Sequence, residues 1–391
     1  MNGWYDITDF GARGDGSTRA EGAINQALAA ASRAGGGVLW FPPGRYLLGA
    51  KVVVDRQVTL LGAGWASRDP AQGSWITAST PGVNLEIRAE GTRVEALGFF
   101  QEQPPRGGGA WQPASHDFAI HAGADDIFLK QINLFNCTKG IKVRHHTGGT
   151  IGRVILDHIW GQPVRTGIEI DNAQDVVKVN NVHFWPFWEG NPGVRDWMMQ
   201  NGTGISVLRA DNPQFSNIFV LGYNRGIAFG ESDNGITSKF AITNADCDSC
   251  ETGIQVGGTN ATGLITNFSS QGGPGNVGLA VISGGVKVLA TNLRITSYRS
   301  NSVRISGNNT KVFIHNLWAE LWNLSGAGFP GVEATSGARV FLGRPLFFDR
   351  GNGAPNFGET DGGQVLSAFD DLMTSCEVVQ TPQGEQYQCD R

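Results

Sequence analysis

The chain has 391 residues, 40% of them hydrophobic and 17% charged, which is enough apolar material for a large buried core. Its formal net charge of −5 argues against a nucleic-acid partner, and no run of about 18 apolar residues predicts a membrane-spanning helix. No signal-peptide pattern follows Met1, so export would need another route or a leader absent from this sequence.

The first 50 residues predict a helix followed by a strand. Apolar residues recur at helical spacing over residues 23–28, three glycines at 35–37 end that helix, and residues 38–46 indicate a strand and a turn. Because the open end of a stacked β-structure exposes its core, we expect the helix to act as a cap. Asp15 is then a turn residue ahead of it.

The central stretch, from Asp126 to Asp349, repeats. Residues 51–101 predict early strands, and the glycine- and proline-rich loop 103–113 interrupts them. An asparagine, replaced once by aspartate and once by arginine, then recurs every 23 to 36 residues: Asn133, Asp157, Asn181, Asn217, Asn244, Asn267, Asn292, Asn316 and Arg344. A period in this range indicates stacked supersecondary units.

Each repeat predicts three short strands. One ends at the asparagine, a second follows it, and a third begins with Gly-Ile or a close variant, as at residues 140–141 and 167–168. Asparagine tolerates the left-handed backbone that a sharp bend needs, and its amide can bond the asparagine one coil away, about 4.8 Å distant. The pattern predicts an all-β fold, a right-handed parallel β-helix, and fits propellers and leucine-rich repeats less well.

The alternation within each strand sorts side chains between core and surface. The residue after each asparagine and the isoleucine after each glycine should point inward, and their neighbours outward. We predict three regions: a cap helix and first strands over residues 1–50, the β-helix over 51–349, and a C-terminal cap or subunit contact over 350–391. A disulfide between Cys376 and Cys389 could form there if the protein is extracellular.

The N-terminal residues carry a family resemblance. Asp-Phe-Gly-Ala and Gly-Asp-Gly within residues 9–16, Ala-Ile-Asn-Gln-Ala at 23–27 and Phe-Pro-Pro-Gly-Arg-Tyr at 41–46 closely resemble the start of the pectate-lyase-like superfamily. Polygalacturonase-type hydrolases, phage tailspike depolymerases, epimerases and lyases share this motif, so it is specific for the fold and not for an activity. The tailspike branch looks closest, and that resemblance implies a homotrimer and an extracellular or virion-associated protein.

Two long turns, residues 103–113 and 186–199, are expected to form walls. About three coils apart, they would stand roughly 14 Å from each other with a sugar-sized cleft between them. Tryptophan rings on these walls could stack on sugars or could pack their own loops, and the acids could reach a substrate or be ordinary loop charges. The substrate-binding candidates here are Trp111, Trp185, Trp188, Glu189, Asp196 and Trp197. A third long turn, 322–330, could wall a second cleft.

The first candidate catalytic pair is Glu169 and Asp171, on the floor between these walls. The two acids are two residues apart on one strand face, about 7 Å from each other, with Lys142 and Arg144 outward in the preceding coil. Glycosidic cleavage needs a proton donor and a second carboxylate, and neighbouring cations would hold one acid ionised. The alternative is a structural salt-bridge patch made by the same four residues.

The second candidate pair is Asp246 and Asp248. The Asn-x-Asp at residues 244–246 is faintly similar to the polygalacturonase catalytic motif, but the Asp-Asp, Gly-His-Gly and Arg-x-Lys elements of that family are not found together. The alternative is a solvated turn. A third pair, Glu231 and Asp233, fits a solvated turn better than a site. Counting columns, the face of the second pair also carries His183, Trp185, Arg294, Trp318 and Glu320.

No metal or cofactor is predicted. Cys247 and Cys250 form a lone Cys-x-x-Cys, whereas a zinc ribbon needs a second close pair, so free or structural thiols are expected. His145 and His146 lack a third ligand at useful spacing and indicate a surface turn.

Three functions remain open. The first is an endo-acting polysaccharide depolymerase, a glycoside hydrolase that cuts a surface or plant glycan with two carboxylates. The second is a polysaccharide lyase acting on uronic acids, with Lys142, Arg144 or Arg294 as the required cations. The third is a glycan-binding spike without catalysis. All three expect a polysaccharide partner and neither nucleic acid nor membrane.

Overall fold

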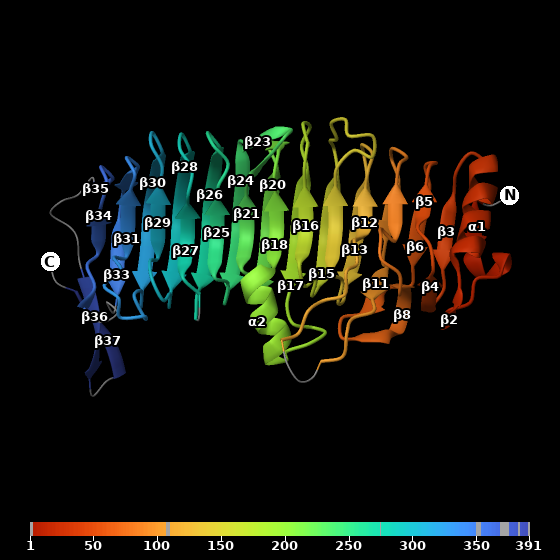
Figure 1. Ribbon diagram of the computed structural model, residues 1–391, viewed down its shortest axis with the longest axis horizontal. Helices are drawn as coiled ribbons and strands as arrows, with labels where there is room; N and C mark the ends of the chain where they lie inside the picture. Colours follow the sequence, from red (N-terminus) through yellow and green to blue (C-terminus); the bar gives the residue numbers. More distant parts are fainter. Residues whose placement is uncertain are drawn as a thin grey trace. The chain divides into compact units, whose positions relative to one another are not determined.

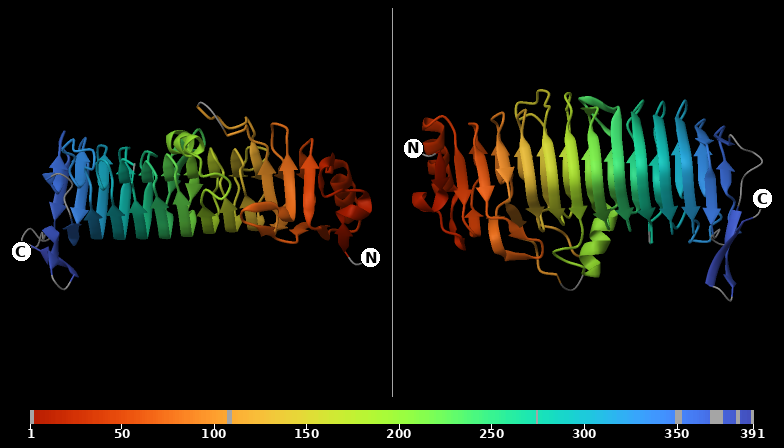
Figure 2. Two further views of the ribbon diagram at one scale, coloured as in Figure 1. Left: turned by 90° about the horizontal axis from the view of Figure 1, so that it is seen from below. Right: turned by 180° about the vertical axis from the view of Figure 1, so that it is seen from behind.

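The computed structural model describes residues 3–106, 110–273, 275–348, 353–367, 375–381 and 384–389; for Phe348 and the last two ranges it describes the backbone. The chain forms two compact units, Met1–Gln214 and Phe215–Arg391, called unit 1 and unit 2 below. Each is built of parallel strands stacked coil upon coil, as Figures 1 and 2 show. The predicted all-β parallel β-helix is confirmed. The division at residues 50 and 349 stays a prediction.

The described residues of unit 1 form two helices, one short 3-10 helix and the first 19 strands. Its elements are β1 (Trp4–Asp6), η1 (Ile7–Phe10), β2 (Asp15–Arg19), α1 (Glu21–Arg33), β3 (Val38–Phe41), β4 (Gly44–Leu48), β5 (Val52–Val54), β6 (Thr59–Gly62), β7 (Trp65–Ala66), β8 (Asp69–Ala78), β9 (Leu85–Ile87), β10 (Arg93–Glu95), β11 (Gly98–Gln101), β12 (Phe118–Ala122), β13 (Phe128–Leu134), β14 (Lys139–Val143), β15 (Ile155–Gly161), β16 (Thr166–Ile170), β17 (Lys178–Phe184), α2 (Pro192–Asn201), β18 (Thr203–Val207) and β19 (Ala210–Asp211).

Unit 2 is formed by strands alone in its described residues. They are β20, which begins at the boundary (Gln214–Leu221), β21 (Arg225–Phe229), β22 (Glu231–Ser232), β23 (Gly235–Ser238), β24 (Phe240–Asp248), β25 (Thr252–Val256), β26 (Thr262–Gln271), β27 (Val277–Val281), β28 (Lys287–Thr296), β29 (Val303–Ser306), β30 (Lys311–Glu320), β31 (Val332–Thr335), β32 (Arg339–Leu342), β33 (Pro345–Phe348), β34 (Phe357–Glu359), β35 (Gln364–Ser367), β36 (Ser375–Thr381) and β37 (Gly384–Cys389).

The N-terminal helix α1 lies where the sequence predicts it. It buries Ile24, Ala27 and Ala31 and contacts β1, β3 and β5. The nearby Asp15 accepts backbone hydrogen bonds from Ser17 and Thr18, as expected of a turn residue. The role of α1 as a cap stays a prediction. No helix in the described ranges is both long and apolar enough to cross a membrane.

The asparagine column of unit 2 is confirmed. Its members all have left-handed φ angles between 54° and 63°: Asn217, Asn244, Asn267, Asn292 and Asn316. From Asn244 onward, each side-chain amide donates to the amide oxygen of the asparagine one coil earlier, over 3.4, 3.0, 2.8 and 2.9 Å in chain order. Because the bend residue sits inside one hydrogen-bonded run, the first two predicted strands of each coil form one bent strand.

In unit 1 the prediction of this column is partly wrong. The left-handed bend residues are Gln131, with φ 55°, His158, with φ 58°, and Asn181, with φ 54°. Asn133 therefore lies two residues past the bend, and Asp157 lies one before it, where its carboxylate accepts from the Asn181 amide over 2.8 Å. Register makes this clear, since Asp157 pairs with Asn180. In unit 2, Arg344 has no left-handed backbone either.

The predicted alternation of faces is confirmed. The isoleucines of the third strands have no exposed surface: Ile141, Ile168, Ile205, Ile227 and Ile254. Register stacks them within each unit, Ile141 on Ile168 on Ile205, and Ile227 on Ile254. The residues between them, such as Lys142 and Glu169, therefore project from the surface. Because side chains alternate along each strand, the buried isoleucines determine which of their neighbours lie on the surface, including the candidate site residues.

The C-terminal strands β36 and β37 pair as an antiparallel ribbon. The register sets Cys376 opposite Cys389. Their side chains lie outside the described part of the structure, so the disulfide stays a prediction.

Candidate functional site

The first candidate pair, in unit 1, is neutralised by cations. Lys142 Nζ lies 3.5 Å from Glu169 Oε1, and Arg144 Nη1 lies 3.4 Å from Asp171 Oδ2. The strands place each cation beside its acid, because Lys142 and Glu169 are register partners on β14 and β16. The Asp171 side chain is only 4% exposed. This arrangement is the salt-bridge patch that the sequence left open as the alternative.

The two long turns of unit 1 touch each other, so the expected open cleft between them is wrong. The ring of Trp111 lies 6.0 Å from that of Trp188 and 6.0 Å, edge to face, from that of Trp197. Trp197 Nε1 also donates to Gln112 Oε1 over 2.8 Å. Trp111 and Trp197 are buried, at 8% and 6% exposure. Apolar rings on opposing turns gain more by burying against each other than by facing water.

Charged and polar groups also join the two long turns. Arg106 forms an ion pair with Glu189 and lies 5.6 Å from the Trp188 ring centroid. The backbone N–H groups of Trp188 and Glu189 both donate to Gln162 Oε1. Asp196 is exposed on α2, which projects from the strands in Figure 2. Substrate-binding roles for these residues stay predictions.

An aromatic surface on unit 1 escaped the sequence analysis. Trp160 lies 4.9 Å from His183, 5.2 Å from His158 and 5.6 Å from Phe187, between ring centroids. Trp65, from the β7–β8 hairpin, lies 5.8 Å from Trp160. All five rings are partly exposed, and burial lowers the pKa of His183. His183 and Trp160 are register partners on β17 and β15. Placing the bend at His158 instead of Asp157 would have predicted this pairing from the sequence.

The second candidate pair, in unit 2, has an unusual protonation state. Asp246 and Asp248 stand two residues apart at the end of β24, near enough for the charge of Asp248 to act on Asp246. Burial, then the charge and hydrogen bond of Asp248, raise the pKa of Asp246 to about 7, while Arg294 acts in the lowering direction. Asp246 Oδ1 is buried without a hydrogen-bond partner. One carboxyl is therefore held protonated near neutral pH beside another acid.

Polar and aromatic side chains extend this site along unit 2. Register runs from Asp246 through Ser269 and Arg294 to Trp318, on β24, β26, β28 and β30. The Arg294 guanidinium lies 5.7 Å from the Trp318 ring centroid, and Trp318 Nε1 donates to Glu320 Oε2 over 3.0 Å. The site thus joins two acids, a cation and a partly exposed indole within three coil steps, about 14 Å.

The remaining candidates lie in turns or in the core. Glu231, in the β22–β23 hairpin, accepts a hydrogen bond from the backbone N–H of Thr259, which follows β25. The rings of His145 and His146 stack at 4.7 Å in a turn. Cys137, Cys247 and Cys250 are buried free thiols. No group of three or more potential metal ligands is arranged around one point in these ranges.

Sequence comparison finds relatives of the N-terminal part. Residues 4–79 match the sequence model of a family described as rhamnogalacturonase A/epimerase, pectate lyase-like. A stretch of 67 residues is 37% identical to alginate lyase 7 of Azotobacter vinelandii; it covers 15% of this chain and 8% of that lyase. The chain thus matches only a small part of that enzyme's length.

Solved structures resemble the whole chain. The N-terminal fragment of gene product 12 of bacteriophage Phi29 superposes with a TM-score of 0.59 at 12% identity, covering 98% of this chain and 73% of that one. A hyperthermoactive exopolygalacturonase from Thermotoga maritima gives 0.54 at 10% identity, covering 93% and 91%. At such identities the likeness carries the fold alone. The chain is a parallel β-helix protein whose N-terminal segment matches the pectate-lyase-like family.

Proposed function

We propose that this protein is a polysaccharide depolymerase that hydrolyses glycosidic bonds at the Asp246–Asp248 pair. The observation that carries the proposal is a pair of neighbouring acids on one strand face, in which Asp246 has a buried carboxyl oxygen without a hydrogen-bond partner and a pKa raised to about 7. Titratable groups perturbed by burial and by a like charge are a mark of functional sites. The Glu169–Asp171 pair, in contrast, is satisfied by its own cations.

The two acids divide the chemistry of glycoside hydrolysis between them. Asp246, as the acid, donates its proton to the glycosidic oxygen while the bond from that oxygen to the anomeric carbon breaks. Asp248, as the carboxylate, either accepts a proton from the attacking water or attacks the anomeric carbon itself. The first route inverts the configuration and the second retains it. Both routes consume one water and leave one new reducing end per bond cut.

Neighbouring side chains would hold the sugar. Trp318 offers an indole to a sugar ring, and Arg294 offers a cation to hydroxyl or carboxylate oxygens. In unit 1, Lys142, Arg144, His183 and the tryptophan turns stay proposed glycan contacts of that unit. The expected homotrimer and the extracellular or virion location also stay proposals. The names of the relatives, an alginate lyase and an exopolygalacturonase, support a glycan as the substrate class.

A lyase on uronic acids is the second candidate. The alginate lyase match favours it, and so does Arg294, because a lyase needs a cation to neutralise the substrate carboxylate before a base removes the neighbouring proton. Here the unprotonated Asp246 would act as the base. Elimination leaves an unsaturated sugar that absorbs ultraviolet light, whereas hydrolysis consumes water and leaves a saturated one.

The test is a screen of capsular, O-antigen, alginate and pectic polysaccharides. Reducing ends and ultraviolet absorbance are measured together on each polymer. New reducing ends without absorbance support the hydrolase, and a parallel rise in absorbance supports the lyase. Binding of a polymer with neither signal supports a spike without catalysis. Full activity in Asp246→Asn and Asp248→Asn variants would contradict the proposed site whatever the substrate.

A further inference from the structure

A regular apolar row runs along the surface of unit 2. Register stacks its members on five successive strands, β26, β28, β30, β32 and β35. The apolar row consists of Leu264, Leu289, Phe313, Phe341 and Leu366. Four of these side chains are between 41% and 51% exposed, and the Phe313 and Phe341 rings stack at 4.4 Å. Exposed apolar side chains in such a continuous file indicate a binding surface.

Polar rows flank the apolar row on both sides. Two residues earlier on three of the strands stands the cation row: Lys287, Lys311 and Arg339. Two residues later on three of the strands stands the donor row: Thr266, Thr291 and His315. The three cations are exposed and form no ion pair with any residue that the structure describes. Surface cations left without partners beside an apolar file favour an anionic ligand.

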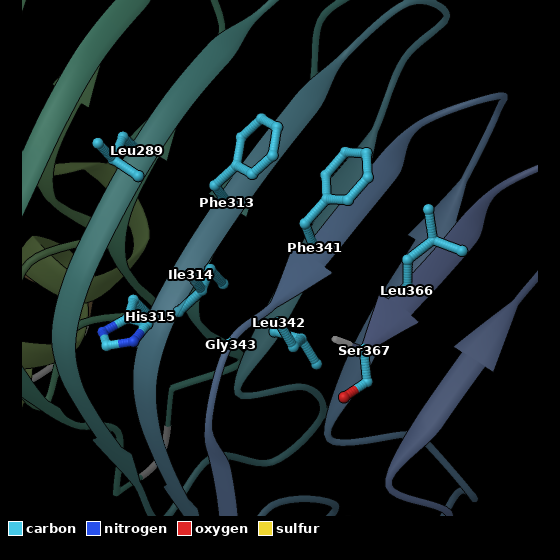
Figure 3. A pocket seen from close by; sticks show the side chains of 9 residues that line it. All are labelled: Leu289, Phe313, Ile314, His315, Phe341, Leu342, Gly343, Leu366 and Ser367. Atoms are coloured by element: carbon cyan, nitrogen blue, oxygen red, sulfur yellow. The ribbon is translucent and has the colours of Figure 1, made fainter. Parts of the chain in front are cut away.

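The surface is hollowed along the apolar row, beside His315 of the donor row. A groove of about 460 Å³ is lined by Leu289, Phe313, Phe341 and Leu366, with His315 at one edge and Ser367 at one end. Figure 3 shows these side chains projecting from successive strands of the sheet. This volume is within the range of sites for small molecules or for a few units of a polymer.

The spacing of the rows excludes several occupants. Coils repeat about every 4.8 Å, whereas same-face side chains of an extended peptide recur about every 6.6 Å, so a peptide would fall out of step. A single lipid carries its charge at one end and would leave most of the cation row unused. A second copy of this chain has the right period, but the apolar row offers on the order of 400 Å², half of the roughly 800 Å² that each partner gives a standard interface.

A linear acidic polysaccharide matches the coil period, the apolar row and the cation row. Its sugar unit is close to one coil spacing in length, has an apolar C–H face, and carries a carboxylate at one edge and hydroxyls at the other. We propose that the cation, apolar and donor rows form an accessory binding site for an acidic polysaccharide. The chain of sugars lies along the apolar row, with its carboxylates toward Lys311 and Arg339 and its hydroxyls toward His315.

This site is separate from the proposed catalytic pair and rests on the proposed function only in taking a glycan as ligand. Affinity electrophoresis of the full chain tests it, in native gels that contain polygalacturonate or, as a neutral polymer, dextran. An Asp246→Asn background keeps the polymer intact. The site variant is Lys311→Gln with Arg339→Gln. The matched control is Lys130→Gln with Lys178→Gln, two exposed lysines of unit 1 with the same change of charge.

The expected result is an affinity for polygalacturonate that falls about tenfold in the site variant and less than about twofold in the control. Because the contact is ionic, retardation should also weaken with salt, and dextran should retard none of the variants. A Phe313→Ser variant, which keeps every charge, should weaken binding by about threefold. Circular dichroism and the unfolding midpoint confirm that each variant is folded.

Two outcomes overturn the inference. Equal losses in the site variant and the control mean that binding follows net charge and not these rows. If Phe313→Ser instead turns an oligomer into a monomer, by light scattering, and leaves retardation unchanged, the apolar row is a subunit contact. Failure of the proposed catalysis is a different result, because a chain that cuts no polymer can still lose retardation on changing Lys311 and Arg339.

Discussion

The two acid pairs of this protein have the same local pattern and opposite surroundings. In each, two carboxylates stand two residues apart at the end of a strand, Glu169 and Asp171 in unit 1 and Asp246 and Asp248 in unit 2. One coil later, both Glu169 and Asp246 have a serine as register partner, Ser206 and Ser269, but Glu169 also has Lys142 one coil earlier. A cation in the adjacent coil forms a salt bridge with Glu169, whereas burial and the charge of Asp248 raise the pKa of Asp246.

The comparison teaches that in a stacked fold a residue's chemistry is set by its neighbours one coil away. Side chains on adjacent coils are about 4.8 Å apart, closer than the roughly 7 Å between residues i and i+2 on one strand. At such distances charges shift a pKa by one unit or more. The sequence distance between Lys142 and Glu169 is 27 residues, so no local motif reports the pairing.

The largest effect should come from removing the acids. We expect Asp246→Asn and Asp248→Asn each to lower kcat by about 10² to 10⁴, because general acid–base groups contribute in this range. Glu169→Gln, the matched change in the other pair, should leave kcat within about twofold. Initial rates on the polymer found by the screen measure this. An inactive Glu169→Gln enzyme with wild-type Asp246→Asn activity would exchange the roles of the two pairs.

A cation placed next to Asp246 should make the second pair behave like the first. Ser269→Lys places a cation beside Asp246 as Lys142 stands beside Glu169, so it should lower the pKa of Asp246. The wild-type rate should fall as pH rises through about 7, where the acid loses its proton. In Ser269→Lys that fall should begin at lower pH, and activity at pH 7 should drop by about tenfold. Lys142→Ser is the control and should leave the pH–rate profile in place.

Stability should respond in opposite directions at the two pairs. Asp171→Asn removes a buried carboxylate from Arg144 and should cost about 1–3 kcal/mol of unfolding free energy, measured with urea near pH 7. For Asp246 the folded-state pKa is raised above the ordinary 3.8, so the folded protein binds the proton more tightly. Its contribution is favourable at low pH and is lost as pH rises from about 4 to 7.

Asp246→Asn should therefore abolish the decrease in unfolding free energy between about pH 4 and 7. The variant should be at least as stable as the wild type at pH 8. If Asp246→Asn destabilised the fold at pH 8 as much as Asp171→Asn does, the second pair would be structural like the first.

The smallest effect concerns Arg294, which lowers the pKa of Asp246 from two coils away. Arg294→Gln should move the alkaline fall of the rate upward by a fraction of a pH unit, since the opposing charge is gone. Arg304→Gln is a suitable control, because Arg304 pairs with Glu333 on another sheet. An unchanged profile would show that Arg294 does not act on this pair.

The sequence carried most of the fold. Gly-Ile strands, period-two alternation and the recurring asparagine sufficed for a parallel β-helix, because each bend needs a left-handed residue that asparagine supplies at low cost. Where another residue accepts that backbone, the pattern fails. Gln131 and His158 occupy the bend in unit 1, so Asn133 and Asp157 were placed in the wrong column. With the column displaced, Trp160 was not recognised as a neighbour of His183.

Contacts between distant segments were decided only by the tertiary structure. The tryptophans of both turns are visible in the sequence. Their contact is not, because Trp111 and Trp197 meet only when two loops about 85 residues apart fold against each other. The sequence likewise supplied four acids of equal promise. Coil stacking sets Lys142 and Ser206 on either side of Glu169 and sets Ser269 beside Asp246, and at such short range the lysine forms a salt bridge with its acid.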